Sequence, residues 1–208
     1  MPARRLVLAS ASPARLATLR AAGLAPEVVV SGVDETGVEG LPATEAVRTL
    51  ADRKAGAVAA RLGPSPEAVP PGRPLVLGCD SLLAFDGEVR GKPASADQAR
   101  TWWRTLRGGR GTLVTGHALV DTGTGRRASG VSETVVRFGS PTDEEVEAYL
   151  ASGEPLAVAG AFTLDGRGAP FVDGIDGDPG TVVGVSLPLV RRLLADLGVL
   201  LTDLWAAA

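Results

Sequence analysis

One segment of the chain, Leu75 to Pro93 (LVLGCDSLLAFDGEVRGKP), constrains the fold more than any other. Its first residues, Leu75 to Leu77, form an apolar run that is typical of a buried strand. Gly78-Cys79-Asp80 follows this run, so we expect a carboxylate at the point where the strand leaves its sheet. Ligands of open α/β sheets bind at the ends of strands. The segment therefore predicts that Asp80 lies near a bound ligand.

The remainder of the segment predicts a β-hairpin that carries a base. Leu82 to Phe85 forms a second short strand, Asp86-Gly87 is a strong type I′ turn signal, and Glu88 to Arg90 returns. Lys92 follows the returning strand. The hairpin would thus present Asp80 and Lys92 toward the same region. This pair suits a phosphate and metal site, and it suits a surface ion pair equally well.

The N-terminal segment predicts a strand that leads into a helix. Arg5 to Ala9 is a short β-type run, and Ala14 to Ala22 is helical, with Ser12 as a good N-cap and Pro13 as a good first residue. A strand, a serine-rich turn and a helix N-terminus together bind phosphate through backbone N–H groups and the helix dipole. Arg15 would add a guanidinium to that site. The alternative is that Ser12 only caps the helix and Arg15 is solvated.

A third strand and a long helix contribute further charged residues. The strand Glu27 to Val30 leads to Asp34 and Glu35. Side chains alternate along an extended chain, so these two acids cannot both face one site, and one of them is expected to be structural. The helix predicted over Pro42 to Leu62 has apolar residues at helical spacing. Lys54 is assigned to its solvated face.

The second half of the chain alternates predicted helices and strands. We expect helices over 95–106, 141–151 and 187–197, and strands over 112–120, 128–138 and 182–185. Ser95 and Ser140 are the expected N-caps of the first two helices. His117 lies within a strand and has no second histidine with which to share a metal, so we expect a core or edge position. The proline-rich stretch Gly63 to Pro74 is expected to be a surface connection.

Composition excludes several classes of function. The net charge of -3 provides no basic field for DNA or RNA. No apolar run is long enough to span a bilayer, and the first ten residues do not resemble a signal peptide. A single cysteine and a single histidine exclude an intramolecular disulfide framework and a Cys/His zinc site, and they fit a cytoplasmic location.

Polar side chains gather at three predicted strand ends. These are Ser10 and Ser12 with Arg15, the pair Asp34 and Glu35, and Asp80 with Lys92. Two carboxylates can hold Mg²⁺ through oxygen, whereas cations and a helix N-terminus bind phosphates. The chain has no Walker A motif, no G-x-G-x-x-G motif and no Ser–His pairing. Metal-assisted hydrolysis of a phosphoanhydride is the chemistry that remains.

The order of these motifs resembles the Maf family of nucleoside triphosphate pyrophosphatases, from Leu6 to about Leu194. The family motif S-x-S-P-x-R appears at 10–15, D-E at 34–35, L-A-x-x-K-A at 50–55, and G-x-D…G-K-P at 78–80 and 91–93. Later matches lie at 153–155, 159–162, 177–178 and 182–184. The resemblance makes Lys54 a candidate site residue.

The resemblance implies an α/β fold with an elongated, mixed and curved β-sheet flanked by helices, similar to the inosine triphosphate pyrophosphatase-like fold. It implies a single domain over residues 1–208, open to a division into two lobes with the active-site cleft between them. The implied protein is a cytoplasmic homodimer whose partner is a nucleoside triphosphate, with no nucleic acid and no membrane. The implied reaction, with Mg²⁺ or Mn²⁺, yields nucleoside monophosphate and pyrophosphate, and removal of non-standard nucleotides is the inferred role.

The resemblance also assigns roles to individual residues. Asp80 is either the proton acceptor for the attacking water or a ligand of the metal that activates it, and Glu35 is the second metal carboxylate. The implied substrate-binding residues are Ser10, Ser12, Arg15, Lys54 and Lys92. The three cations would neutralise the triphosphate as charge moves to the leaving pyrophosphate.

Three positions depart from the family and concern the nucleobase. A dTTP/UTP group carries Arg, Thr and Gln there, a 7-methyl-GTP group carries Trp, Gln and Glu, and this chain has Ala14, Ser81 and Asp165. The resemblance therefore leaves the base open. It also leaves two alternatives for the function. One is a nucleotide-binding regulator of cell division or septum formation that acts through partners, and the other is a phosphohydrolase that releases inorganic phosphate.

Overall fold

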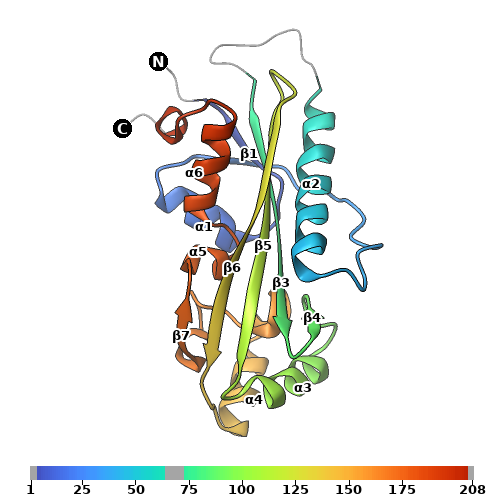
Figure 1. Ribbon diagram of the computed structural model, residues 1–208. Helices are drawn as coiled ribbons and strands as arrows, with labels where there is room; N and C mark the ends of the chain where they lie inside the picture. Colours follow the sequence, from blue (N-terminus) through green and yellow to red (C-terminus); the bar gives the residue numbers. More distant parts are fainter. Residues whose placement is uncertain (1–3, 64–72, 206–208) are drawn as a thin grey trace. The chain divides into compact units, whose positions relative to one another are not determined.

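The computed structural model describes residues 4–63 and 73–205 and contains a mixed sheet flanked by helices (Figure 1). The strands are β1 (Leu6–Leu8), β2 (Glu27–Val28), β3 (Leu75–Phe85), β4 (Glu88–Arg90), β5 (Arg110–Asp121), β6 (Arg127–Phe138) and β7 (Val172–Asp176). The sheet order is β2-β1-β3-β5-β6-β7, with β4 paired to β3. β1 is parallel to β2 and β3, whereas β4 and β7 are antiparallel to their partners. The predicted α/β class with a mixed sheet is confirmed.

Helices and short 3₁₀ turns connect the strands. The α-helices are α1 (Pro13–Ala21), α2 (Ala43–Leu62), α3 (Ala96–Leu106), α4 (Asp143–Ala151), α5 (Pro179–Val183) and α6 (Leu187–Asp196). The 3₁₀ turns are η1 (Glu154–Ala157), η2 (Ala159–Ala161), η3 (Ala169–Phe171) and η4 (Leu201–Leu204). The N-caps predicted at Ser12 and Ser95 are confirmed, because each side chain accepts a bond from a first-turn N–H group. Within the described ranges, no helix combines the length and the apolar character needed to cross a membrane.

The chain divides into two compact units. Unit 1 comprises Met1–Asp80, Thr115–Ser132 and Gly184–Ala208, and unit 2 comprises Ser81–Val114 and Glu133–Val183. Strands β3, β5 and β6 contribute residues to both units.

In unit 1, alternation along the strands separates two apolar layers. Leu6, Leu8, Leu75, Leu77 and Cys79 pack with residues of α1 and α6. Val7, Ala9 and Val76 pack with Ala51, Ala55 and Val58 of α2. The parallel register Leu6↔Leu75 and Val7↔Val76 keeps each set on one face of the sheet. Helix α2 therefore covers one face, and α1 and α6 cover the other (Figure 1).

Helix α2 lies unusually close to the sheet because two strand positions are glycines. A Cβ at Gly78 would lie 2.4 Å from the Ala51 carbonyl oxygen, and one at Gly116 would lie 2.3 Å from the Val47 carbonyl oxygen. Helix packing, not a strand end, thus accounts for Gly78. The prediction that the strand ends at Gly78 is wrong, because β3 continues to Phe85 and Asp80 lies inside it.

Unit 2 has an aromatic core on the other part of β3, β5 and β6. The core residues on these strands include Leu83, Phe85, Leu113, Val136 and Phe138, and they pack with α3, α4 and Phe162. The predicted β3–β4 hairpin is confirmed. Its turn residues Asp86 and Gly87 have φ of 49° and 77°, as a type I′ turn requires.

Two predictions differ from the structure, and one falls largely outside the described residues. The strand predicted over 182–185 is wrong, because Asp178 accepts a bond from Gly180 N and Pro179 begins the short helix α5. The N-cap of α4 is Thr142, not Ser140, and it forms a capping box with Glu145. Residues 64–72 of the predicted proline-rich connection lie outside the described residues.

Candidate active site

A buried lysine joins two carboxylates in unit 1. Lys54 Nζ of α2 donates to Asp80 Oδ1 at 2.5 Å and lies 2.7 Å from Glu35 Oε1. Lys54 is 8% exposed and Asp80 is 7% exposed, whereas the Glu35 side chain is 60% exposed. Two carboxylates on different segments thus converge on a single cation.

The fold explains this pairing residue by residue. Asp80 lies two residues beyond Gly78 on β3, so strand alternation directs it to the face covered by α2. Lys54 lies three residues after Ala51, whose backbone contacts Gly78, and so belongs to the buried face of α2. The prediction of a solvated Lys54 is wrong, because this i, i+3 spacing places it on the buried face. That spacing was the signal in the sequence that could have identified it.

The surroundings of Asp80 change its proton affinity. Burial raises the pKa of the Asp80 carboxyl, because the charged form loses its hydration. The Lys54 ammonium and the Arg15 guanidinium oppose this rise in pKa, and the Glu35 carboxylate reinforces it. Asp80 is therefore a carboxyl group shielded from solvent, and the nearby positive charges of Lys54 and Arg15 favour its ionised form.

Of the two adjacent acids, Asp34 is structural and Glu35 faces the lysine. Asp34 accepts bonds from Thr36 N at 2.9 Å and from Thr36 Oγ1 at 2.8 Å, and these bonds lower its pKa. The prediction that one of the two acids is structural is confirmed. Arg53 Nη1 of α2 donates to the Thr36 carbonyl at 2.7 Å, which ties the loop to the helix. An open hollow of about 530 Å³ lies at this loop, lined by Val33, Asp34, Thr36 and Arg53.

Arg15 connects the serine turn to two other segments. Its Nη1 donates to Ser10 Oγ and to the Cys79 carbonyl, each at 3.0 Å, and its Nε donates to the Gly184 carbonyl at 2.8 Å. Ser12 Oγ caps α1 by accepting from Arg15 N at 3.3 Å. The alternative of a solvated Arg15 is therefore wrong. The carbonyl of Cys79 belongs to the peptide bond that joins Cys79 to Asp80. Arg15 therefore connects Ser10 to the backbone directly beside the Asp80–Lys54 pair.

The structure brings six predicted site residues together within unit 1. They are Ser10, Ser12, Arg15, Glu35, Lys54 and Asp80. Ala14 is half-buried in the first turn of α1. Three other predicted residues belong to unit 2: Ser81, which follows Asp80 along β3, and the exposed Lys92 and Asp165. Over residues 4–63 and 73–205, no group of three or more His, Cys, Asp or Glu side chains is arranged to hold a metal ion.

The family resemblance includes residues 153–155 but gave Glu154 no role, and the structure shows that Glu154 holds the loop of Asp165. Glu154 accepts hydrogen bonds from Thr163 Oγ1, from Gly168 N at 3.2 Å and from Arg167 N at 3.2 Å. A Cβ at Gly166 would lie 2.6 Å from Glu154 Oε1. The sequence alone does not reveal this contact, because Glu154 lies 12 and 14 residues before Gly166 and Gly168 and reaches them only when the chain is folded.

Comparison with known proteins gives consistent results over the whole chain. The sequence model of the family described as "Maf-like protein" matches residues 5–197, which include all the candidate residues. A nucleoside triphosphate pyrophosphatase of Streptomyces coelicolor is 60% identical over 207 residues, covering 100% of this chain and 97% of the relative. Proteins of the same name from Streptomyces avermitilis and Salinispora tropica are 59% and 55% identical. These alignments cover 98% and 97% of this chain, and 96% and 88% of the relatives.

Proposed function

This chain belongs to the family of Maf-like proteins, and from that premise we propose that it hydrolyses nucleoside triphosphates to nucleoside monophosphate and pyrophosphate. The observation that carries the proposal is the buried Asp80–Lys54 pair, with Glu35 on the same ammonium group. Relatives that align over nearly their whole length and are named nucleoside triphosphate pyrophosphatases support it.

Each site residue has a chemical role in this proposal. Asp80 accepts the proton of the attacking water or binds the metal that activates that water. Its raised pKa makes it a better proton acceptor than an ordinary carboxylate. Arg15 and Lys54 neutralise the charge that develops on the leaving pyrophosphate. The same role for Lys92 stays a prediction of the family resemblance.

The two serines are suited to bind phosphate. Ser10 Oγ accepts from Ser12 N at 3.2 Å and from Arg15 Nη1 at 3.0 Å. A hydroxyl that accepts two bonds keeps its own O–H as a donor. In the proposal, Ser10 and Ser12 donate these O–H groups to phosphate oxygens at the N-terminus of α1.

The charged residues of unit 1 fit a divalent cation. Asp80 and Glu35 would hold Mg²⁺ or Mn²⁺, since both carboxylates already converge on one cation, the ammonium of Lys54. A bound divalent ion would lower the pKa of a water ligand and polarise a phosphoryl oxygen. Because Lys54 lies between the same oxygens, K54Q should bind Mn²⁺ more tightly than the wild type, on the order of tenfold. Titration calorimetry without substrate measures this, and unchanged or weaker binding would argue against these two ligands.

Product analysis tests the proposed reaction. The wild type and D80N are incubated with Mg²⁺ or Mn²⁺ and with UTP, dTTP, CTP and 7-methyl-GTP, and the products are separated. We expect monophosphate and pyrophosphate from the wild type and a loss of about 10²-fold or more in D80N. The matched control is D121N, which alters another buried acid of unit 1, one paired with Arg4 at 2.7 Å.

Other outcomes of this experiment identify the alternatives. Release of inorganic phosphate would favour a different phosphohydrolase. Binding without turnover across the whole panel would refute the enzyme and favour the nucleotide-binding regulator. The ranking of substrates would identify the base, which we expect Ala14, Ser81 and Asp165 to select.

Removal of non-standard nucleotides is the cellular role that we propose. The homodimer, the cytoplasmic location and the cleft between two lobes stay predictions of the family resemblance. Sedimentation of the purified chain tests the homodimer directly.

A further inference from the structure

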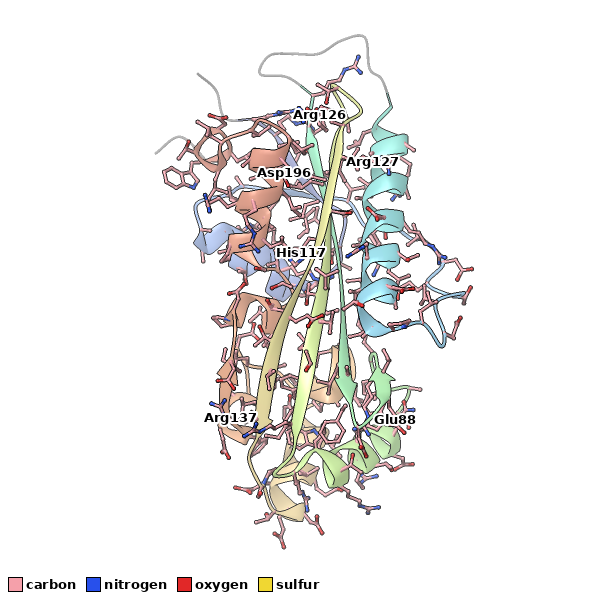
Figure 2. The ribbon with its side chains drawn as sticks, viewed as in Figure 1. Glu88, His117, Arg126, Arg127, Arg137 and Asp196 are labelled. Atoms are coloured by element: carbon pink, nitrogen blue, oxygen red, sulfur yellow. The ribbon has the colours of Figure 1, made fainter. Side chains whose placement is uncertain are left out.

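The lone histidine of the chain forms hydrogen bonds inside unit 1. His117 lies on β5 (Figure 2), and its side chain is fully buried. Its Nδ1 lies 3.1 Å from the Thr115 carbonyl oxygen, and its Nε2 accepts from Ser186 N at 2.8 Å. A carbonyl can only accept and a backbone N–H can only donate, so Nδ1 carries the proton and Nε2 does not. The neutral ring thus links β5 to the segment that precedes α6.

That segment has a fixed conformation at both ends. Ser186 is the N-cap of α6, with its Oγ accepting from Leu189 N at 3.3 Å. Gly184 has a φ of 111°, which residues with a Cβ rarely adopt. The Gly184 carbonyl accepts the bond from Arg15 Nε. The carbonyl that binds Arg15 thus lies two residues before the amide that His117 binds.

Arg15 carries the connection to the active site. Its Nη1 binds Ser10 Oγ and the carbonyl of Cys79, the residue that precedes Asp80. The charge of Arg15 also lowers the pKa of Asp80. His117 is thus connected through Ser186 and Gly184 to Arg15. Arg15 in turn binds Ser10 and the carbonyl that precedes Asp80.

We propose that His117 is a positioning residue for the active site, which sets Arg15 through the Gly184–Ser186 segment. This inference rests on the proposed function, because its effect is measured on that reaction. Loss of the Nε2 acceptor leaves the buried Ser186 N–H without its bond, and the segment then moves to find another acceptor. The Gly184 carbonyl moves with it, and Arg15 loses the orientation that catalysis needs.

Two amide variants separate this role from simple packing. In H117Q the amide oxygen and nitrogen are separated by one carbon, as the ring nitrogens are, so they can replace both bonds. In H117N the amide lies one bond closer to the backbone, where it reaches Thr115 and not Ser186. We expect kcat/KM to fall about tenfold or more in H117N and to stay within about threefold of the wild type in H117Q.

A double-mutant cycle tests whether the effect passes through Arg15. Once R15K has removed the guanidinium, H117N should lower kcat/KM by less than about twofold. The control D121N lies outside these contacts, so any change that it makes in kcat/KM should be the same with Arg15 and with R15K. Melting temperatures are measured for every variant, so that activity refers to folded protein.

Several outcomes would overturn the inference. A lower melting temperature of H117N with an unchanged kcat/KM makes His117 a packing residue only. An effect of H117N on kcat/KM that multiplies fully with that of R15K leads to the same conclusion. If H117N does not fold, G184A is the second test, because its strained φ displaces the same carbonyl, and we expect the same non-additivity with R15K. An inactive wild type would refute the proposed function, whereas an active wild type with an active H117N refutes only this inference.

Discussion

The two compact units are built from different kinds of side chain. The buried clusters of unit 1 contain Leu, Val, Ala and Cys79. The core of unit 2 contains six aromatic rings in edge-to-face contact, namely Phe85, Trp103, Phe138, Tyr149, Phe162 and Phe171. Both cores pack on segments of the same strands, β3, β5 and β6.

From this difference we expect the core of unit 2 to matter more for stability and the small residues of unit 1 to matter more for the proposed activity. Large rings fill the core of unit 2 and add favourable edge-to-face contacts. Small residues in unit 1 let the backbone of α2 approach β3, which brings Lys54 to Asp80. A buried ion pair contributes little net stability, because desolvation offsets the attraction between the charges. Unit 1 thus contains a buried ion pair whose position depends on the tight packing of α2.

The largest effect on stability should come from the aromatic core. Trp103 is fully buried, contacts three other rings and donates from Nε1 to the Ala161 carbonyl at 2.9 Å. W103A should lower the free energy of unfolding by about 3–5 kcal/mol, because it leaves a cavity. Urea unfolding measures this loss, and W103F, which keeps a ring, should lose less. The kcat of the folded protein should change less than twofold, and a large fall in kcat would contradict the separation of roles.

The next effect should come from the close approach of α2. In G78A the new Cβ would meet Ala51 O at 2.4 Å and Ala55 N at 2.7 Å, so α2 must move away from β3. We expect a loss of about 1–3 kcal/mol in stability and a fall in kcat/KM of about tenfold or more, because Lys54 moves with the helix. Activity should therefore suffer more than in W103A, although stability suffers less.

A matched glycine supplies the control for G78A. A Cβ at Gly91 of unit 2 would meet only Leu82 Cδ2, at 3.4 Å, an ordinary contact. G91A should therefore leave stability nearly unchanged. If G78A were as stable and as active as the wild type, close packing of α2 could not be what positions Lys54.

Local signals in the sequence predicted most of the fold. The caps at Ser12 and Ser95 and the Asp86-Gly87 turn are set by short-range chemistry, and all are confirmed. The strand predicted at 182–185 was wrong, because β-branched residues followed an Asp-Pro helix start. Local preference alone did not decide between a strand, which the β-branched residues favour, and a helix, which the Asp-Pro start favours.

The site was less predictable, because its partners are far apart in the chain. The sequence predicted that one of Asp34 and Glu35 is structural but not which one. The hydrogen bonds from Thr36 show that it is Asp34. The acceptors of Arg15 include two backbone carbonyls, which no residue type specifies. Hydrogen bonds to carbonyls depend on the path of the backbone, so the role of His117 was also hidden.

A smaller effect on stability should follow from Glu154, the residue that holds the Asp165 loop in unit 2. Burial raises its pKa, but bonds from Thr163, Arg167 and Gly168 outweigh burial, so the folded-state pKa is lowered. The ionised form therefore stabilises the fold above the ordinary carboxyl pKa, and this stability is lost as the pH falls through the folded-state pKa. E154Q should cost about 1 kcal/mol near pH 7 and progressively less as the pH falls through the folded-state pKa of Glu154. Urea unfolding at a series of pH values measures this change, and a loss that does not depend on pH would show that shape, not charge, holds the loop.

The smallest effect should come from an ion pair of unit 1 that is not buried. Arg5 binds Glu27 through two nitrogen–oxygen contacts of 2.9 Å, which lower the pKa of Glu27, but both side chains are about half exposed. Solvent screens such a pair, so E27Q should cost about 0.5 kcal/mol or less, fading as salt is added. Its kcat/KM should equal that of the wild type, whereas E35Q, which removes a charge from the exposed partner of the buried Lys54, should lower it. Equal losses of activity in the two variants would mean that net charge, not contact with Lys54, is what the reaction needs from these glutamates.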